Sequence, residues 1–334
     1  ASSQSLYTPR NILDAYAKGT RSTDGKPGKN YWQNTGRYDI KITTAPPAKE
    51  VRGTETITYF NNSSDTLRSL VIRLILNIHK PGAARDYPVG AEYLTDGIII
   101  DSFIANGQAY RWDNDMSATW QNVRLMRALP PHDSINLYVK WHYNVSDLSN
   151  REGMLEPTSF FLAYFYPRVS VYDDYYGWDV IDFTDQKEFY SDFNDYTLSV
   201  TVPKNFIVWA TGDLQNPDEV LQPAYATKYK QSLTSSDVIR IVTPQDIQSK
   251  NITRQNEMNT WHFVARNVPD VTVGLSDHYN WDATSTVVDE AAGRRTSVQA
   301  AYLDSSRDYH YMVSWVQKDL AWLSTKWPGW PYPY

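Results

Sequence analysis

The six histidines decide first whether this chain can hold a catalytic metal. A hydrolytic zinc centre needs two histidines one helical turn apart, with a glutamate beside the first to activate water. No two histidines here stand four residues apart, none precedes a Glu, and they fall at His79, His132, His142, His262, His278 and His310. The sequence contains no Cys, which excludes thiolate ligands and a cysteine nucleophile. We therefore predict no zinc-hydrolase centre, no thiolate metal ligand and no cysteine nucleophile in this chain.

Aromatic rings and carboxylates gather between residues 159 and 196. This segment contains the runs 160–168 (FFLAYFYPR), 172–179 (YDDYYGWD) and 188–193 (EFYSDF), and Arg168 is nearly its sole cation. So many rings suit a wall against a ligand or another domain better than a solvated loop.

The carboxylates of the same segment leave two other chemistries open. Asp174 and Glu188 are candidates for the carboxylate pair of a glycosidase. Asp173, Asp174 and Asp179 could hold calcium, although their spacing matches no EF-hand loop. The plainer interpretation is that these carboxylates lie in solvated turns.

The elements that position this segment are predicted to be strands. From residue 31 apolar residues alternate with polar ones, as at Tyr38, Ile40 and Ile42, and again in 55–59 and 135–143. A turn-forming cluster at 61–65 (NNSSD) links two of these runs. A strand buried on both sides is predicted over 70–76, and later strands over 196–202, 206–210, 238–242, 260–264 and 271–275. Many short strands without helical periods predict a mainly β fold, either an antiparallel sandwich or a large curved sheet.

The pattern changes after about residue 285. Apolar residues then recur at steps of three and four, which predicts one amphipathic helix near 300–326, ended by 327–329 (WPG). Either this helix docks on the sheet, or it begins a domain that continues past Tyr334. The polar N-terminus reads as an extension with a short helix near Asn11–Tyr16. The predicted organisation is an extension over 1–30, a β-domain over 31–285, and a linker with the helix over 286–334.

The composition and charge of the chain limit the kinds of partner it can bind. The net charge of −6 and a pI near 5.5 argue against nucleic acid, whose binding proteins carry basic patches. No apolar run reaches the length needed to span a membrane. The chain has 12 Trp and 25 Tyr, which we attribute mostly to packing on pleated sheets. It opens 1–4 (ASSQ) without a signal sequence, as a mature form after signal removal would.

A set of motifs in a fixed order resembles a known family. The sequence is similar, from about residue 31 to its end, to the N-terminal domain of bacterial aminopeptidase N-like zinc metallopeptidases, the gluzincins. The motifs that carry the resemblance are 38–40 (YDI), 53–59 (GTETITY), 61–63 (NNS), 166–168 (YPR), 171–174 (VYDD), 177–178 (GW), 188–190 (EFY), 201–206 (TVPKNF), 210–212 (ATG) and 261–270 (WHFVARNVPD).

The resemblance implies a saddle-shaped β-domain that packs on a thermolysin-like catalytic domain. The helix over 309–323 then resembles the first helix of that catalytic domain. The Gly-x-Met-Glu and His-Glu-x-x-His motifs would follow Tyr334, so zinc is expected in the missing C-terminal domain and not in this chain.

The family's β-domain also supplies one substrate-binding group. It is a Gln or Glu, a few residues before the Tyr-Pro-Arg stretch, that binds the free amine of the peptide through a charge-assisted hydrogen bond. This sequence departs from the pattern, because Ala163 and Tyr164 occupy the nearby positions. The phenol or ring face of Tyr164 can contact an ammonium group. Tyr164 and Arg168 are the predicted substrate-binding residues.

The predicted function is therefore a non-catalytic domain that forms one wall of the peptide cleft of a periplasmic or secreted metallopeptidase. Its predicted partners are the catalytic domain and the peptide. The alternative is a stand-alone aromatic-rich β-module that binds carbohydrate or peptide on residues 164–178. A His-Glu-x-x-His motif further along the reading frame separates the two.

Overall fold

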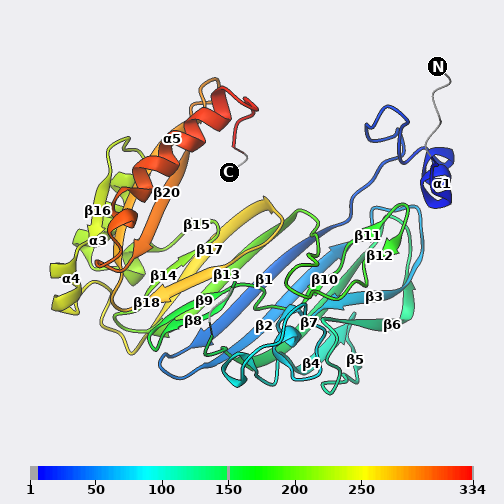
Figure 1. The fold of residues 1–334 in the computed structure, drawn as a ribbon, viewed down its shortest axis with the longest axis horizontal. Helices are drawn as coiled ribbons and strands as arrows, with labels where there is room; N and C mark the ends of the chain where they lie inside the picture. The colour runs from blue at the N-terminus through cyan, green and yellow to red at the C-terminus, as the bar shows by residue number, and fades with distance from the viewer. Residues whose placement is uncertain (1–6, 149–150, 333–334) are drawn as a thin grey trace.

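The computed structural model describes residues 7–148 and 151–332. A long curved sheet forms the middle of the molecule, a smaller sheet with helix α5 stands at one end, and the N-terminal segment lies at the other (Figure 1). The fold is mainly β, with several antiparallel sheets and a C-terminal helix, so the predicted fold class is confirmed.

Eight strands make up the main sheet. In spatial order they are β15 (Asp213–Leu214), β17 (Met258–Val268), β13 (Asn194–Pro203), β1 (Thr35–Thr44), β2 (Glu50–Phe60), β7 (Ser134–Asn144), β4 (Ile99–Ala105) and β5 (Gln108–Tyr110). Neighbouring strands pair antiparallel, except that β1 pairs parallel to β13. The main sheet is therefore predominantly antiparallel, as predicted.

Four smaller sheets surround it. They comprise β10 (Arg168–Val169), β3 (Leu67–Arg73) and β6 (Trp120–Leu129); β11 (Tyr172–Asp173) and β12 (Gly177–Trp178); β14 (Ile207–Ala210), β18 (Val273–Ser276), β9 (Ser159–Leu162) and β8 (Gly153–Glu156); and β16 (Ile239–Val242), β19 (Asn280–Asp289) and β20 (Arg294–Tyr302). The α-helices are α1 (Arg10–Lys18), α2 (Pro217–Val220), α3 (Pro223–Ser232), α4 (Pro244–Ser249) and α5 (Met312–Thr325). Three short 3₁₀ helices are η1 (Ile75–His79), η2 (Ala91–Tyr93) and η3 (Arg307–Tyr311). Within the described residues, no helix is both long and apolar enough to cross a membrane.

Alternation along β2 explains how the main sheet meets the aromatic segment. Every second residue of β2 is buried, and one of them is Gly53. A Cβ atom at Gly53 would lie 2.3 Å from Cζ2 of Trp141, so only glycine leaves room for this ring against the sheet. The indole of Trp141 in turn donates to the carbonyl of Phe165 at 2.9 Å. The sheet thereby holds the segment that contains the predicted site residues.

Several elements differ from those predicted. The strand predicted over 70–76 ends at Arg73, because the backbone turns into η1 with a hydrogen bond from Asn77 N to Leu74 O. The strand predicted over 238–242 is confirmed as β16, but the three short helices α2, α3 and α4 on either side of it, between residues 217 and 249, were not expected. The short N-terminal helix and the long C-terminal helix are confirmed as α1 and α5.

The predicted linker after residue 285 contains part of a hairpin. β19 and β20 pair along 280–302, and the boundary drawn at 285 falls inside β19. β20 alternates as a half-buried strand does, and its buried residues are Thr296, Val298, Ala300 and Tyr302. The predicted division into three segments otherwise stays a prediction, and its residues 1–6 and 333–334 lie outside the described residues.

Candidate functional site

Tyr164 sits just beyond β9 in a strained backbone position. Its φ is +58°, in the left-handed region that few non-glycine residues occupy. The half-buried ring packs against Phe183 and Phe189, with centroids 5.6 Å and 5.5 Å away. Burial raises the pKa of the phenol, while the neighbouring Arg151 lowers it. Tyr164 therefore has a ring held among other rings and a phenol beside a cation.

Arg168 is buried rather than presented at the surface. Its side chain is 4% exposed, and Nη2 donates to Oδ1 of Asp270 at 2.8 Å. The guanidinium also lies 4.4 Å above the ring of Tyr166, whose hydroxyl donates to the same Asp270 oxygen. Burial alone would lower the pKa of Arg168, but Asp270 outweighs it and the pKa is raised. The structure thus gives Arg168 a partner inside the protein, and its assignment to substrate binding stays a prediction.

The carboxylates considered for a glycosidase have cationic partners. Asp174 accepts hydrogen bonds from the guanidinium of Arg21, the shortest at 2.8 Å, and from the hydroxyl of Thr20 at 2.6 Å. Asp173 shares the same guanidinium, which lies 4.3 Å above the ring of Tyr175. Burial alone would raise the pKa of Asp174, but the hydrogen bonds from Arg21 hold it low. Asp174 is thereby tied to the N-terminal segment.

Glu188 and Asp179 are likewise paired, in two different places. Glu188 forms an exposed ion pair with Arg151. Asp179 pairs with Arg73, and the two side chains are 4% and 1% exposed. Among residues 7–148 and 151–332, no group of three His, Cys, Asp or Glu side chains is placed to hold a metal ion. The three aspartates weighed for calcium are therefore not gathered into one site in the described part of the chain.

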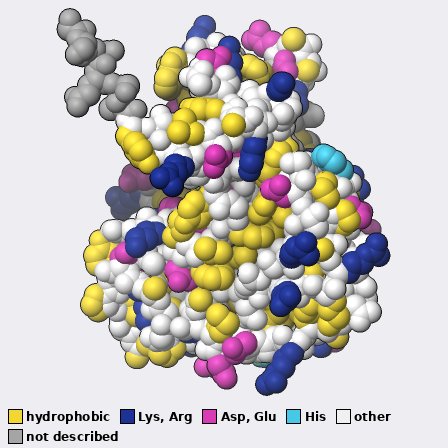
Figure 2. Space-filling model, turned by 90° about the vertical axis from the view of Figure 1, so that its right-hand side faces the viewer, with side chains coloured by type: hydrophobic (Ala, Val, Ile, Leu, Met, Phe, Trp, Pro, Cys, Tyr) yellow, Lys and Arg dark blue, Asp and Glu magenta, His cyan; other side chains and the backbone are white. Residues whose placement is uncertain are grey.

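The face around β11 and β12 carries exposed rings. Tyr176, Tyr190 and Phe193 are between 45% and 60% exposed, and Trp32 stacks on Tyr172 with centroids 5.8 Å apart. Figure 2 views this end of the molecule and shows hydrophobic side chains in a band, with acidic and basic side chains mixed around them. Such a surface suits contact with a macromolecule or a sugar.

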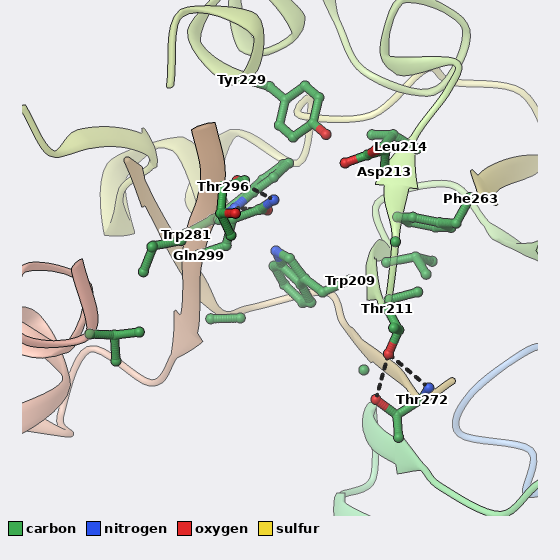
Figure 3. A pocket seen from close by; sticks show the side chains of 18 of the residues that line it. Trp209, Thr211, Asp213, Leu214, Tyr229, Phe263, Thr272, Trp281, Thr296 and Gln299 are labelled. Atoms are coloured by element: carbon green, nitrogen blue, oxygen red, sulfur yellow. Dashed lines mark hydrogen bonds between the residues drawn. The ribbon is translucent and has the colours of Figure 1, made fainter. Parts of the chain in front are cut away.

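A cleft lies elsewhere, between the four-stranded sheet with the adjoining edge strand β15 of the main sheet and the C-terminal unit, which consists of β19, β20 and α5. Its volume is about 910 Å³, and its walls come from β14, β15 and β18 on one side and from β19, β20 and α5 on the other. Figure 3 shows Trp209, Trp281 and Tyr229 around the cavity, with the carboxylate of Asp213 directed toward Tyr229. This volume falls in the range of pockets that bury a ligand or several side chains.

The aromatic wall of the cleft is internally packed. Trp281 meets Trp209 edge to face at 5.9 Å and 89°, and Tyr229 lies 5.6 Å from Trp281. The indole of Trp281 donates to Oε1 of Gln299 at 3.1 Å, which joins β19 to β20 (Figure 3). Burial raises the pKa of Tyr229 to about 12, with a further contribution from Asp213. At neutral pH this phenol is a neutral hydrogen-bonding group.

The cleft is lined by a mixture of charged, polar and apolar side chains. Its walls carry one carboxylate, from Asp213, two guanidinium groups, from Arg294 and Arg295, and otherwise hydroxyls, an amide and apolar groups. The lining found among the described residues includes no histidine. Neither Tyr164 nor Arg168 lines this cleft.

No motif or spacing in the sequence predicts the cleft. Trp209 and Trp281 lie in strands that are far apart in the chain. In the sequence, each has the surroundings of an aromatic residue packed in a β-sheet core. Only the path of β14, α3 and β19 through space brings them together.

Comparisons with known proteins give structural similarities only. The sequence matches no family model and no curated protein. Similar solved structures include an M1 zinc metallopeptidase from Deinococcus radiodurans, with a TM-score of 0.43, 16% identity, and coverage of 83% of this chain and 49% of that one. A mutant of the M1 enzyme from the same organism, bound to a Tyr-Ser-Ala substrate, gives a TM-score of 0.45 at 16% identity and covers 92% of this chain and 56% of that one. This chain thus spans about half the length of the structures it matches.

Proposed function

We propose that this chain is the N-terminal, non-catalytic domain of a zinc aminopeptidase-like metallopeptidase. In this proposal it packs on the catalytic domain, which holds the zinc, and its β-domain forms one wall of the peptide cleft. The proposal rests on the ordered motifs between residues 38 and 270 and on one feature of the C-terminal unit, described next. Export to the periplasm or outside the cell belongs to the same proposal.

The feature that carries the proposal is a set of exposed aromatic and apolar side chains on α5 and directly before and after it. The inner face of α5 covers β19 and β20 through Val313, Val316 and Leu320. Six large apolar or aromatic side chains lie outside this contact and are between 42% and 79% exposed. They are Tyr311, Trp315, Trp322, Leu323, Trp327 and Trp330. Large rings left in water at this density mark an interface with another protein surface. A catalytic domain of which α5 is the first helix would cover them.

Trp322→Glu tests this docking. In a longer protein that includes the catalytic domain, we expect the change to destabilise the protein by about 2 kcal/mol or more, because a central aromatic anchor is replaced by a charge. In the 334-residue chain the same change should stay within about 0.5 kcal/mol, because Trp322 is exposed there. Met126→Glu is the matched control, since Met126 is exposed on β6 in the opposite half of the chain.

The measurement is the melting temperature and the denaturant midpoint of each variant. Both are determined in the 334-residue chain and in the longer protein. Equal effects of Trp322→Glu in the short and long chains would remove α5 from the domain interface. The absence of a His-Glu-x-x-His helix from the longer reading frame would remove the proposed class altogether.

Tyr164→Ala tests the cleft wall. In a longer, active protein the change should lower kcat/KM about five- to thirty-fold, the cost of losing one cation–π or phenol contact with the amine of the peptide. Tyr164→Phe is the matched control: it keeps the ring and removes only the hydroxyl, so it separates a ring contact from a phenol contact. A fall in melting temperature with unchanged kcat/KM would make Tyr164 a packing residue and no part of the peptide cleft.

A second candidate function is a stand-alone module that binds carbohydrate or peptide. The observation that favours it is the exposed ring surface around β11 and β12 (Figure 2). Titration of the 334-residue chain with soluble oligosaccharides and peptides, followed by calorimetry, distinguishes this module from a domain whose partner is a second protein surface.

A further inference from the structure

His278 is held by carboxylates at both of its ring nitrogens. Nδ1 lies 2.7 Å from Oδ1 of Asp277, and Nε2 lies 2.8 Å from Oε2 of Glu156. An ionised carboxylate only accepts hydrogen bonds, so both nitrogens must carry a proton. The geometry therefore describes a doubly protonated imidazolium between two acidic side chains.

This residue occupies a joint of the fold. β18 ends at Ser276 in the four-stranded sheet, and β19 begins at Asn280 in the three-stranded sheet that carries α5. Residues 277–279 connect the two. His278 thus stands where the chain passes from one wall of the cleft to the other, and the next residue, Tyr279, lines the cleft.

The groups on the other side of the joint come from the hairpin of β8 and β9. Glu156 ends β8, and Thr158 follows in the turn. The hydroxyl of Thr158 donates to Oδ1 of Asp277 at 2.7 Å and also lies 3.2 Å from Nδ1 of His278. Leu155, beside Glu156, lines the cleft as well. Two adjacent residues of the joint are therefore fastened to one hairpin turn.

The titratable groups that face the imidazole are Glu156, Asp277 and Tyr279. The ring of Tyr279 packs edge to face on the imidazole at 5.3 Å, and burial raises its pKa, so it stays neutral while His278 titrates. Burial alone would lower the pKa of His278, but the hydrogen bonds to Asp277 and Glu156 outweigh it and the pKa is raised. Loss of a proton leaves a nitrogen lone pair facing a carboxylate, which removes one of the two contacts.

We propose that His278 is a pH-sensitive latch on the cleft: the imidazolium fastens the joint 277–279 to the β8–β9 hairpin, and deprotonation releases it. The direction follows from the raised pKa. The stabilisation is fully present below the unfolded-state value, near 6.5, and is lost as the pH rises through the folded-state value. The latch does not depend on the proposed function, since every group in it belongs to this chain.

Hydrogen exchange tests the latch in the 334-residue chain. After correction for intrinsic exchange rates, we expect protection of residues 276–281 to fall about three- to ten-fold between pH 6 and pH 9, because the ring loses its positive charge and one of its two hydrogen bonds to partly exposed carboxylates. Glu156→Gln should move the midpoint of this change to lower pH, and His278→Asn should abolish the change. His132→Asn is the matched control, because His132 is exposed at a turn with φ of +57°, which Asn tolerates.

A distance measurement reports on the cleft itself. The sequence has no Cys, so cysteines introduced at Lys204 and Lys318, both exposed, give two unique sites for spin labels. The distribution of distances should broaden from pH 6 to pH 9 in the parent chain and be broad at both pH values with His278→Asn. Protection and distances that do not change with pH, or that change equally with His278→Asn, would overturn the latch.

Discussion

Asp179→Asn is expected to destabilise the fold by about 3–5 kcal/mol, because it leaves the charge of Arg73 buried and unpaired. Arg73 donates to the hydroxyl of Ser170 at 3.2 Å and to the carbonyl of Ile181, while Asp179 accepts from the backbone N–H of Ile181 at 3.1 Å. The pair therefore fixes the segment after β10 against β3. Denaturant unfolding of the variant measures the loss.

The double variant Arg73→Met with Asp179→Leu supplies the control. Apolar residues of similar size commonly replace a buried ion pair at little cost, so the double variant should recover most of the stability lost by Asp179→Asn. If Asp179 instead served as a calcium ligand, the single variant would lower calcium affinity and leave unfolding in chelator unchanged. That outcome would contradict the structural role.

Glu55→Met is expected to stabilise the protein by about 1–3 kcal/mol at neutral pH, because an unsatisfied buried carboxyl group is removed. Glu55 lies in the buried row of β2 and is 2% exposed. Neither of its oxygens has a hydrogen-bond partner among the described residues. Burial raises the pKa of Glu55 well above its ordinary value, with Arg168 opposing the shift.

The sign of the pH dependence follows from that raised pKa. In the folded protein Glu55 keeps its proton above about pH 4.3, where the unfolded chain has lost it, so the stability of the parent falls as the pH rises from there toward the folded-state value. The advantage of Glu55→Met should therefore grow between pH 4 and pH 8 in chemical unfolding. Glu50→Gln, on the exposed side of the same strand, is the control and should change little. An advantage that is constant with pH would mean that Glu55 is not protonated in the fold.

Local patterns in the sequence predicted the local structure well. Alternation at Tyr38, Ile40 and Ile42 placed the buried face of β1, and the same rule put Glu55 on the face of Ile57 and Tyr59. The three-and-four spacing around Val313 and Val316 predicted α5. These patterns succeed because one buried face imposes its period on the chain.

The ion pairs of the candidate site could not be predicted, because their partners are far apart in the chain. No pattern around Asp174 announces Arg21, 153 residues away, and none around Arg168 announces Asp270, 102 residues away. Charges that read as solvent-facing are therefore paired inside the fold. The helices between residues 217 and 249 were not predicted for another reason. The longest of them, α3, is short, begins at a proline and buries only Ala226, Tyr229 and Ser232, so it leaves no clear helical pattern of apolar residues.

The parallel pairing of β1 with β13 affects how the chain can fold during synthesis. Arg37 lies opposite Asp195, so about 160 more residues must be synthesised after β1 before β13, its second neighbour in the sheet, can pair with it. At ribosomal rates of about 5–20 residues per second, that edge stays open for roughly 8–30 seconds. Long-range pairing of this kind slows folding, and an open strand edge invites pairing with other chains. Chaperones that cover extended segments should therefore raise the soluble yield most when they act before residue 200 has left the ribosome.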